Sequence, residues 1–432
     1  MAYLKQQTLD LFPNEMKVNQ DYSATFADNM KLPIHKWYRY TAGFSASWVN
    51  GLILSELKHG RSKVIDPFAG SGTVLLESGF EGVQSYGIEA HPYIYRIARV
   101  KLNWNYSPEI FKKEALSFLN EAKQKTVVQT EFPELIQSCY PVETIQKLET
   151  LKQSWVYSYR EENINNFIWF IITSILRSTS PVGTAQWQYI QPNKSKSKVL
   201  DPYTAFEAKV YEMYEDMRRV KHRVKNIAES IILNEDARNI KSIPEKWGDL
   251  VITSPPYANN YDYADATRLE MTFWGDIKGW SDLQDQVRKN LVRACTQHVS
   301  NLGNEIDVIL TNPKLKAIQP ELLDIYHTLK EERLKHGGKK NYHLMIAAYF
   351  NDLAEVFHSL RRVTSDRCKM CFVIGDSAPY GVYVPVDRWL GELALSAGFG
   401  SYSFEKLRDR NVKWKNRKHT IPLHEGRLWI NS

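Results

Sequence analysis

Lys63-Val-Ile-Asp-Pro-Phe-Ala-Gly-Ser-Gly-Thr73 is the stretch with the strongest structural pattern in this 432-residue chain. Lys63 to Ile65 predicts a short buried strand, and the Asp-Pro pair and two glycines after it predict a tight loop. Val74 to Ser78 then opens a helix. A strand, a glycine-containing loop and a helix in this order are typical of one unit of an open α/β sheet.

The residues that follow extend this pattern. Gln84 to Glu89 predicts a second strand that ends on an acid, and Tyr95 to Lys101 predicts the helix after it. Three later runs have the apolar character of buried strands: Ser230 to Asn234, Leu250 to Thr253 and Lys369 to Ile374. We therefore expect the fold class α/β, with a doubly wound sheet.

Two long segments interrupt the strands. Residues 105–229 are rich in amphipathic, charged stretches, such as Val142 to Ser158 and Ala205 to Ala228, and predict a mainly helical insertion. Its most apolar run, Phe167 to Leu176, predicts a buried helix. The polar segment 276–340, which ends in His336-Gly-Gly-Lys-Lys340, predicts a second insertion.

The composition is that of a globular protein, with 43% hydrophobic and 24% charged residues. No stretch approaches the roughly 18 uncharged apolar residues of a membrane span, and the N-terminus lacks the apolar core of a signal peptide. Four scattered cysteines are too few for a disulfide framework. We therefore expect a cytoplasmic protein.

Positive charge is concentrated at the C-terminus. The chain carries +7 overall, and the last 32 residues alone hold eight Lys or Arg against three acids. Within them Trp414 is surrounded by cations, which suits contacts with nucleic-acid phosphates. The candidate phosphate-binding residues are Lys413, Lys415, Arg417 and Lys418.

The loop from Asp66 to Thr73 has the features of a ligand-binding turn. Glycine lets the backbone approach a ligand, and the next helix begins with free N–H groups. Only Gly70 and Gly72 are glycine and no P-loop lysine follows, so the carboxylate of S-adenosylmethionine is a better candidate than a phosphate. Glu89, 23 residues after Asp66, is placed like the acid that binds a ribose hydroxyl pair in doubly wound folds.

Thr253-Ser-Pro-Pro-Tyr257 predicts a rigid extended loop at the end of a buried strand, because two adjacent prolines do not fit a helix or a sheet interior. A rigid loop suits methylation of an exocyclic base amine, whose lone pair is conjugated into the ring. The Ser254 hydroxyl and the Pro255 carbonyl can accept its two N–H groups. Tyr257 can stack on a base flipped out of the duplex.

These motifs resemble bacterial DNA amino-methyltransferases of the restriction–modification type, which form N4-methylcytosine or N6-methyladenine. Asp66 to Thr73 is similar to the cofactor loop of this family, and Thr253 to Tyr257 to its catalytic loop. Asn234-Glu-Asp-Ala-Arg238 resembles the segment whose aspartate, here Asp236, binds the cofactor adenine amine. His35 to Phe44 is similar to an N-terminal segment that contacts the cofactor.

Two further segments are similar to the family: Tyr261 to Glu270 resembles the helix after the catalytic loop, and Val373 to Ser377 a later core strand and turn. The resemblance implies a Rossmann-like S-adenosylmethionine-dependent methyltransferase sheet with a large, mainly helical insertion. It implies double-stranded DNA and a cognate restriction endonuclease as partners, and no metal. It assigns catalysis to Ser254, Pro255, Pro256 and Tyr257, and cofactor binding to Phe44, Asp66, Pro67, Phe68, Gly70, Gly72, Thr73, Glu89, Asp236 and Thr253.

The chain departs from the family in two ways. The helical insertion puts 147 residues between Glu89 and Asp236. The cofactor motifs also precede the catalytic loop, whereas many members with Ser-Pro-Pro-Tyr have the reverse order. In the family, Ser-Pro-Pro-Tyr leans towards cytosine N4 and Asn- or Asp-Pro-Pro-Tyr towards adenine N6. Cytosine N4 is therefore favoured, with adenine N6 as the alternative.

Three other features are not expected to form sites. Cys368-Lys-Met-Cys371 lies in a strand-like run whose alternation puts the two cysteines on opposite faces, and it has no second pair to bind zinc. Pro-Cys, which carries the nucleophile of cytosine C5 methyltransferases, does not occur. The run Lys194-Ser-Lys-Ser-Lys198 is expected to be a surface loop.

Two other functions stay open. An RNA or tRNA base methyltransferase could use the same basic C-terminus, because phosphate contacts carry no sequence information. DNA is favoured because no separate RNA-binding module precedes Asp66. A catalytically silent, cofactor-binding recognition subunit would be expected to have a broken motif, and both loops are intact here.

The expected organisation follows from these assignments. Segment 276–340 is assigned to base recognition because it follows the catalytic loop. We expect an N-terminal cofactor segment with the first half of the core at 1–104, the helical insertion at 105–229, the second half of the core at 230–275, the recognition insertion at 276–340, the end of the core at 341–400 and a basic segment at 401–432.

Overall fold

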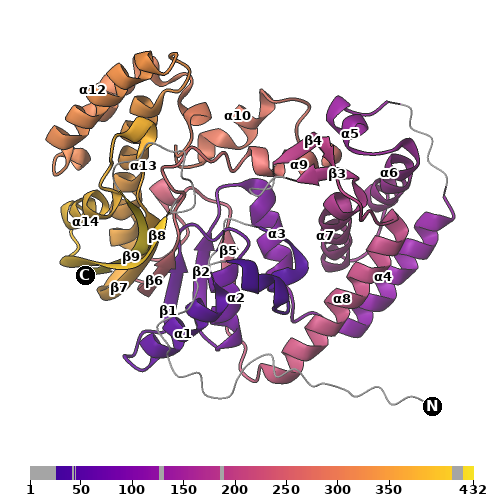
Figure 1. The fold of residues 1–432 in the computed structure, drawn as a ribbon. Coiled ribbons are helices and arrows are strands. Elements are labelled where there is room, and N and C mark those ends of the chain that lie inside the picture. The colour runs from indigo at the N-terminus through magenta and orange to yellow at the C-terminus, as the bar shows by residue number, and fades with distance from the viewer. Residues whose placement is uncertain (1–25, 41–42, 44, 126–130, 185–188, 411–421) are drawn as a thin grey trace.

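A mixed seven-stranded sheet forms the centre of the molecule (Figure 1). The computed structural model describes residues 26–40, 43, 45–125, 131–184, 189–410 and 422–432. The strand order is β5-β2-β1-β6-β7-β9-β8. The strands are β1 (Lys63–Asp66), β2 (Gln84–Ile88), β5 (Ser230–Leu233), β6 (Gly248–Thr253), β7 (Thr364–Gly375), β8 (Ser401–Arg410) and β9 (Leu423–Asn431).

The strands β5, β2, β1, β6 and β7 are parallel to one another, and β9 and β8 are antiparallel to their neighbours. The five strands predicted from the sequence are all present among them. A mostly parallel sheet with helices on both faces is an α/β fold. Because parallel strands end at one edge, the loops after β1, β2, β6 and β7 meet on the same side of the sheet.

Helices bury both faces of this sheet. Val64 and Leu250 pack in one apolar cluster with α1 (Ala46–Leu57), α2 (Thr73–Phe80) and α3 (Pro92–Leu102). Their neighbours Ile65 and Val251 pack on the other face, in the cluster that contains α13 (Tyr342–Val363) and α14 (Val386–Ser396). Successive residues of a strand point to opposite faces, so apolar runs in β1 and β6 serve both clusters.

The chain between α3 and β5 forms a separate group of helices on one side of the sheet, to the right in Figure 1. The run from Phe167 to Leu176 lies in α7 and is buried, as its composition predicts. A hairpin of β3 (Val182–Thr184) and β4 (Ile190–Ser195) was not predicted, because its strands are short and polar. The helices are α4 (Pro108–Lys123), α5 (Glu134–Cys139), α6 (Val142–Val156), α7 (Glu162–Thr179) and α8 (Pro202–Arg223).

The segment after the catalytic loop combines short helices with long connections. Its helices are α9 (Arg268–Trp274), α10 (Asp282–Gln286), α11 (Ile306–Leu310) and α12 (Gln319–Lys335). Residues of segment 276–340 such as Ala294, Val299 and Leu315 are buried in the α13 cluster. This segment is therefore partly core, and not only the added surface that its polar composition predicts.

Short 3-10 helices complete the described elements. They are η1 (Phe26–Lys31), η2 (His35–Trp37), η3 (Ala237–Asn239), η4 (Asp265–Thr267), η5 (Arg288–Asn290), η6 (Thr296–Val299), η7 (Leu302–Asn304), η8 (Pro313–Leu315) and η9 (Pro379–Gly381). Among the described residues, no helix combines the length and the apolar composition needed to span a membrane.

The sheet continues beyond residue 400, where the sequence suggests only a basic segment. Strand β9 pairs with β7, and β8 pairs with β9 at the sheet edge. Leu428 and Ile430 of β9 are fully buried and alternate with less buried residues, as expected for a strand with one face on the core. The cations Arg408 and Arg427 pair across these strands with Glu425 and Glu405, so they belong to a folded surface.

Candidate functional site

A pocket opens at the carboxyl edge of the parallel strands. Several residues singled out from the sequence meet there although they lie far apart in the chain: Pro67, Phe68, Gly70, Glu89, Asp236, Ser254 and Pro256. The remaining lining residues are Tyr40, Ile88, Ala90, His91, Ala237, Tyr263, Asn290, Leu291 and Val292. One pocket therefore joins the predicted cofactor loop, Asp66 to Thr73, to the predicted catalytic loop, Thr253 to Tyr257.

The loop after β1 turns sharply because of two glycines. Gly70 has φ 52° and Gly72 has φ 86°, a left-handed conformation that disfavours side chains. A Cβ at Gly70 would lie 3.1 Å from the ring of Tyr40, so this glycine also leaves room for the N-terminal segment. Gly72 caps the start of α2, and Thr73 is buried in its first turn.

Glu89 holds this loop from the end of β2. Its two carboxylate oxygens accept hydrogen bonds from the backbone N–H of Gly70 and of His91, each at 2.8 Å. Burial raises the pKa of Glu89 to about 7, against the lowering effect of these two hydrogen bonds. The carboxylate lines the pocket and keeps lone pairs that can accept from a ligand hydroxyl.

Asp66 and Thr253 lie beneath the pocket and are not among its lining residues. The Thr253 hydroxyl donates to the Asp66 carboxylate at 2.6 Å, and the N–H of Phe68 donates to it at 3.1 Å. Burial raises the pKa of Asp66 to about 7. The pair links the ends of β1 and β6, so it positions the cofactor loop relative to the catalytic loop.

A buried lysine supports the same turn. Lys101 of α3 is 1% exposed, and its ammonium group donates to the carbonyl of Ser71 at 2.8 Å. Burial lowers the pKa of Lys101 to about 7. Lys101 therefore supports the turn through the Ser71 backbone oxygen, and it is not among the residues that line the pocket.

Two lining residues near the cofactor loop were missed from the sequence. Tyr40 comes from the segment His35 to Phe44, in which Phe44 is the predicted contact; Phe44 lies outside the described residues. His91 bridges Glu89 to the catalytic side, because its Nε2 lies 2.9 Å from the Thr267 hydroxyl. Burial lowers the pKa of His91 to about 3, so the imidazole is neutral.

Asp236 lines the opposite wall of the pocket, after β5. Its carboxylate accepts hydrogen bonds from the backbone N–H and from the guanidinium of Arg238, and this guanidinium also pairs with the buried Asp352 at 3.3 Å. These hydrogen bonds from Arg238 hold the Asp236 side chain in place, and its carboxylate caps the turn that begins at Ala237. It remains on the pocket surface, where it can accept from an amine.

The catalytic loop crosses the mouth of the pocket. Ser254 donates its hydroxyl hydrogen to the Val373 carbonyl of β7 at 3.2 Å, which leaves its oxygen lone pairs for another donor. Ser254 and Pro256 line the pocket, whereas the buried Pro255 and the half-buried Tyr257 are not among its lining residues. The Arg410 guanidinium stacks 5.2 Å from the centre of the Tyr257 ring and donates to the Asp376 carbonyl at 3.0 Å.

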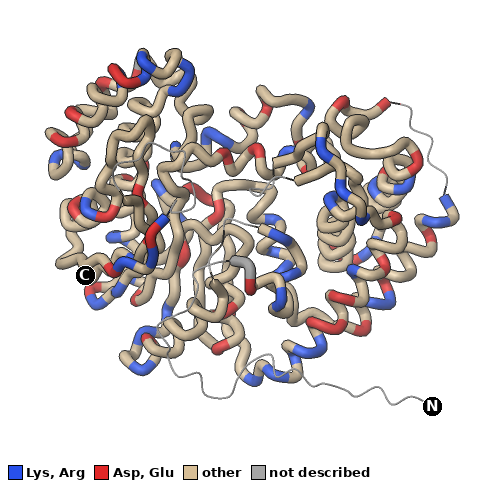
Figure 2. Tube along the Cα trace, in the orientation of Figure 1, with Lys and Arg blue, Asp and Glu red and all other residues tan. Residues whose placement is uncertain are grey.

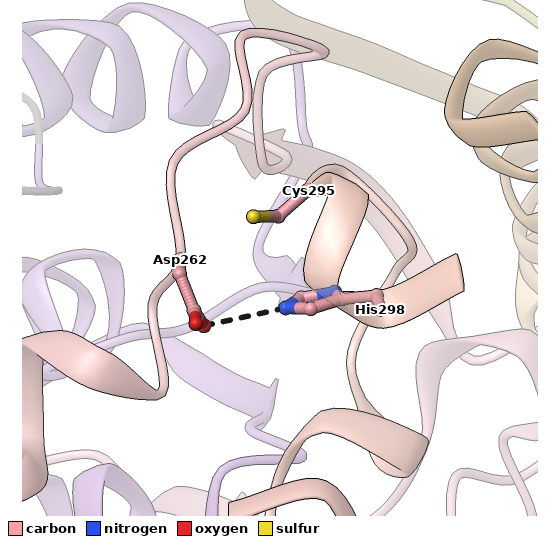
Figure 3. Close-up of side chains that lie close together, drawn as sticks. All are labelled: Asp262, Cys295 and His298. Atoms are coloured by element: carbon pink, nitrogen blue, oxygen red, sulfur yellow. Dashed lines mark hydrogen bonds and ion pairs between the residues drawn. The ribbon is translucent and has the colours of Figure 1, made fainter. Parts of the chain in front are cut away.

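A buried ionic cluster joins the segment after the catalytic loop to a second wall of the pocket. Asp262 accepts from the Arg288 guanidinium at 2.6 Å. Its other oxygen lies 3.4 Å from His298 Nε2, the contact drawn in Figure 3. Burial opposes ionisation of Asp262, but hydrogen bonds from His298 and Arg288 outweigh it and lower the pKa to about 2. The cluster holds the segment that supplies Asn290 to Val292 to the pocket.

The same cluster contains donor types that bind metals. Asp262, Cys295 and His298 offer atoms within 4.8 Å of one another (Figure 3). The Arg288 guanidinium already occupies Asp262, and burial raises the pKa of Cys295 to about 12. A neutral thiol beside a buried cation does not favour metal binding, and a structural role fits this cluster better.

Two other predictions concern the cysteine pair in β7 and the basic C-terminal residues. Cys368 and Cys371 are free and buried on opposite faces of β7, which confirms the alternation argument. The four predicted phosphate-binding cations, Lys413, Lys415, Arg417 and Lys418, lie outside the described residues.

Curated relatives match nearly the whole chain. Type II methyltransferase M.AvaI of a Nostoc species is 26% identical over 420 residues, covering 90% of this chain and 84% of that protein. M.BsoBI of Geobacillus stearothermophilus is 24% identical, covering 89% and 82%. M.MvaI of Kocuria varians is 22% identical, covering 96% and 94%. No protein-family model and no solved structure matches the chain. The resemblance inferred from the motifs is confirmed by these relatives.

Proposed function

We propose that this chain, a relative of restriction–modification methyltransferases, is a site-specific DNA methyltransferase that uses S-adenosylmethionine to methylate an exocyclic base amine, with cytosine N4 favoured. One observation carries the proposal: Glu89, Asp236 and Ser254 line the same pocket. The pocket thereby brings together three groups from the ends of three strands. Glu89 is an acid suited to a ribose, Asp236 is an acid suited to an amine, and Ser254 supplies a hydroxyl suited to a target base.

The residues of the pocket fit S-adenosylmethionine. Glu89 would accept from the ribose hydroxyls, and Asp236 from the adenine amine. The apolar Phe68 and Ile88 border the same space and can cover the flat adenine. The N–H groups of the loop around Gly70 would face the methionine carboxylate. Bound there, the cofactor supplies an electrophilic methyl group attached to a sulfonium.

The catalytic loop is suited to hold a base amine against that methyl group. Ser254 already donates its hydrogen to Val373, so its oxygen acts towards the amine as an acceptor. The Pro255 carbonyl would accept the second N–H, and the two acceptors would pull the nitrogen towards a pyramidal shape. Tyr257, supported by Arg410, would stack against a flipped base.

We also propose roles for the sheet, the helical group and segment 276–340. The sheet would be the Rossmann-like core of methyltransferases, and the helices α4 to α8 an insertion between its cofactor-binding strands. Segment 276–340 would contribute base recognition from its exposed parts. Its inner part, with Asn290 to Val292, would contribute to the pocket. The substrate would be double-stranded DNA.

Methylation-aware sequencing tests the function directly. DNA from cells that express the wild-type protein should carry a modified amino group at one short sequence, and DNA from cells with Ser254→Ala should not. A parallel assay with radiolabelled S-adenosylmethionine should label DNA and not tRNA. Labelling of tRNA alone, or wild-type labelling of DNA by Ser254→Ala, would overturn the proposal. N6-methyladenine in place of N4-methylcytosine would change only the base.

A further inference from the structure

The hairpin of β3 and β4 lies beside the catalytic loop, although it belongs to the helical group. The backbone N–H of Asp262, five residues after Tyr257, donates to the hydroxyl of Tyr189 at 2.9 Å. The rings of Tyr189 and Tyr261 are 5.4 Å apart. Tyr189 immediately precedes β4, so this strand begins at the segment that follows the catalytic loop.

A row of tyrosines continues from the hairpin to the pocket. The ring of Tyr261 meets that of Tyr263 edge to face at 4.6 Å, and Tyr263 lines the pocket with Ser254. These ring contacts therefore connect the hairpin to the wall of the pocket.

The hairpin segment has the chemistry of a polyanion contact. From Arg177 to Leu200 the sequence contains four cations and no Asp or Glu, and it is rich in Ser and Gln. Figure 2 shows the basic positions along the hairpin. Cations together with neutral hydrogen-bond donors are the side chains that contact phosphates in protein–DNA complexes.

Two of its lysines are available for such a contact. Lys194 and Lys198 are exposed, and neither forms an ion pair with any described residue. Lys196, between them, donates to the Arg177 carbonyl and anchors the hairpin to α7. Nearby acids are already paired: Glu270 with Arg177, and Asp265 with Arg268.

The second half of β4 is exposed. From Pro192 to Ser195 every residue of β4 is exposed. A two-stranded hairpin is marginally stable by itself, so its attachment at Tyr189 and Lys196 is what places it at the catalytic edge. Val182 and Ile190 anchor the hairpin to the apolar cluster of the helical group, whereas the exposed residues from Pro192 onward are available to a partner.

We propose that the end of β4 and the residues directly after it form a DNA-backbone binding site, in which Lys194 and Lys198 contact phosphates next to the flipped base. The inference rests on the proposed DNA substrate and adds a contact that the sequence did not assign, since Lys194 to Lys198 suggests only a surface loop. The lysines act at a distance from the reacting atoms, so they contribute to binding and not to the chemical step.

The test is the salt dependence of DNA binding by the full chain. Lys194→Gln/Lys198→Gln is compared with wild type on a duplex that carries the methylated sequence found in cells. Each phosphate contact contributes about 0.9 to the log–log slope of affinity against salt, so the slope should fall by up to about 1.8. The KM for DNA should rise while kcat stays at the wild-type value.

A matched control removes two cations elsewhere. Lys58 and Lys225 are exposed just before β1 and β5, at the opposite edge of the sheet, so Lys58→Gln/Lys225→Gln should keep the wild-type slope. Lys194→Arg/Lys198→Arg should keep it too. An unchanged slope in the Lys194→Gln/Lys198→Gln protein would overturn the assignment. If wild type itself neither binds nor methylates DNA, the proposed function fails first.

Discussion

The Glu89 carboxylate accepts a 2.8 Å hydrogen bond from the backbone N–H of Gly70. This contact joins the acid at the end of β2 to the glycine loop at the end of β1, so the two sequence motifs form one surface. A change at Glu89 would therefore affect both the ribose acceptor and the shape of the loop.

We expect Glu89→Gln to weaken S-adenosylmethionine binding. Glutamine has one carbonyl oxygen for the two backbone N–H groups, and its NH2 cannot accept from a ribose. Hydrogen bonds to a charged group contribute about 1.5–3 kcal/mol, or roughly 10- to 150-fold in affinity. Calorimetric titration measures the change. Affinity equal to wild type would show that the ribose is bound elsewhere.

The affinity for S-adenosylmethionine should rise with pH through about 7. Burial raises the pKa of Glu89 to about 7, so the acid is mostly protonated at pH 6 and mostly ionised at pH 8. The ionised form is the better acceptor. Titrations at both pH values should show the rise in wild type and lose it in Glu89→Gln. Asp66→Asn should keep the rise with pH even if it lowers the affinity itself, because Asp66 has a similar pKa and positions the cofactor loop but does not line the pocket.

Ser254→Ala should abolish most of the methyl transfer and leave cofactor affinity intact. Loss of one transition-state hydrogen bond typically costs about 2.7–4 kcal/mol, or about 100- to 1,000-fold in rate. Single-turnover transfer to DNA measures the rate. Ser300→Ala, at an exposed serine outside the pocket, should behave like wild type. Full activity in Ser254→Ala would mean that another group orients the amine.

Asp262→Asn should destabilise the protein by about 3–5 kcal/mol, because it leaves the buried Arg288 without its charge partner. The pKa of Asp262 is about 2, below its unfolded value of about 3.9. Its stabilisation is therefore present above about pH 4 and lost as pH falls towards 2. Urea unfolding between pH 3 and 7 measures both effects.

A substitution in an exposed ion pair is the control for the stability effect of Asp262→Asn. Glu162 pairs with Arg99, and both side chains are more than half exposed. Glu162→Gln should change stability by about 1 kcal/mol or less. If Asp262→Asn were equally mild, the cluster in Figure 3 would not be what holds the wall of the pocket.

Neutralising Lys413, Lys415, Arg417 and Lys418 together should weaken binding to all DNA sequences alike. Phosphate contacts are independent of sequence, and each one removed should lower the salt slope by about one unit. Binding to a cognate and a scrambled duplex at several salt concentrations measures this. If the slope and affinity stay at wild-type values, phosphate binding belongs to other cations, and the β3–β4 hairpin is the first candidate.

The strands that could be predicted from the sequence are those with a strong local pattern. Buried parallel strands are short apolar runs, and β1, β2, β5, β6 and β7 were predicted for that reason. Polar strands such as β4 have no such pattern. Strands β8 and β9 were obscured by charged residues such as Arg408 and Arg427, which pair across the sheet with Glu425 and Glu405.

The sequence by itself determined the α/β class and the two loops, because a glycine turn and a double proline limit the backbone within a few residues. The placement of Tyr40, His91 and Asn290 in the pocket was decided only by the tertiary structure. Their positions depend on long-range contacts, such as the Asp262–Arg288 pair and the packing of the N-terminal segment over Gly70. A local sequence pattern does not show which distant segments will be buried against one another.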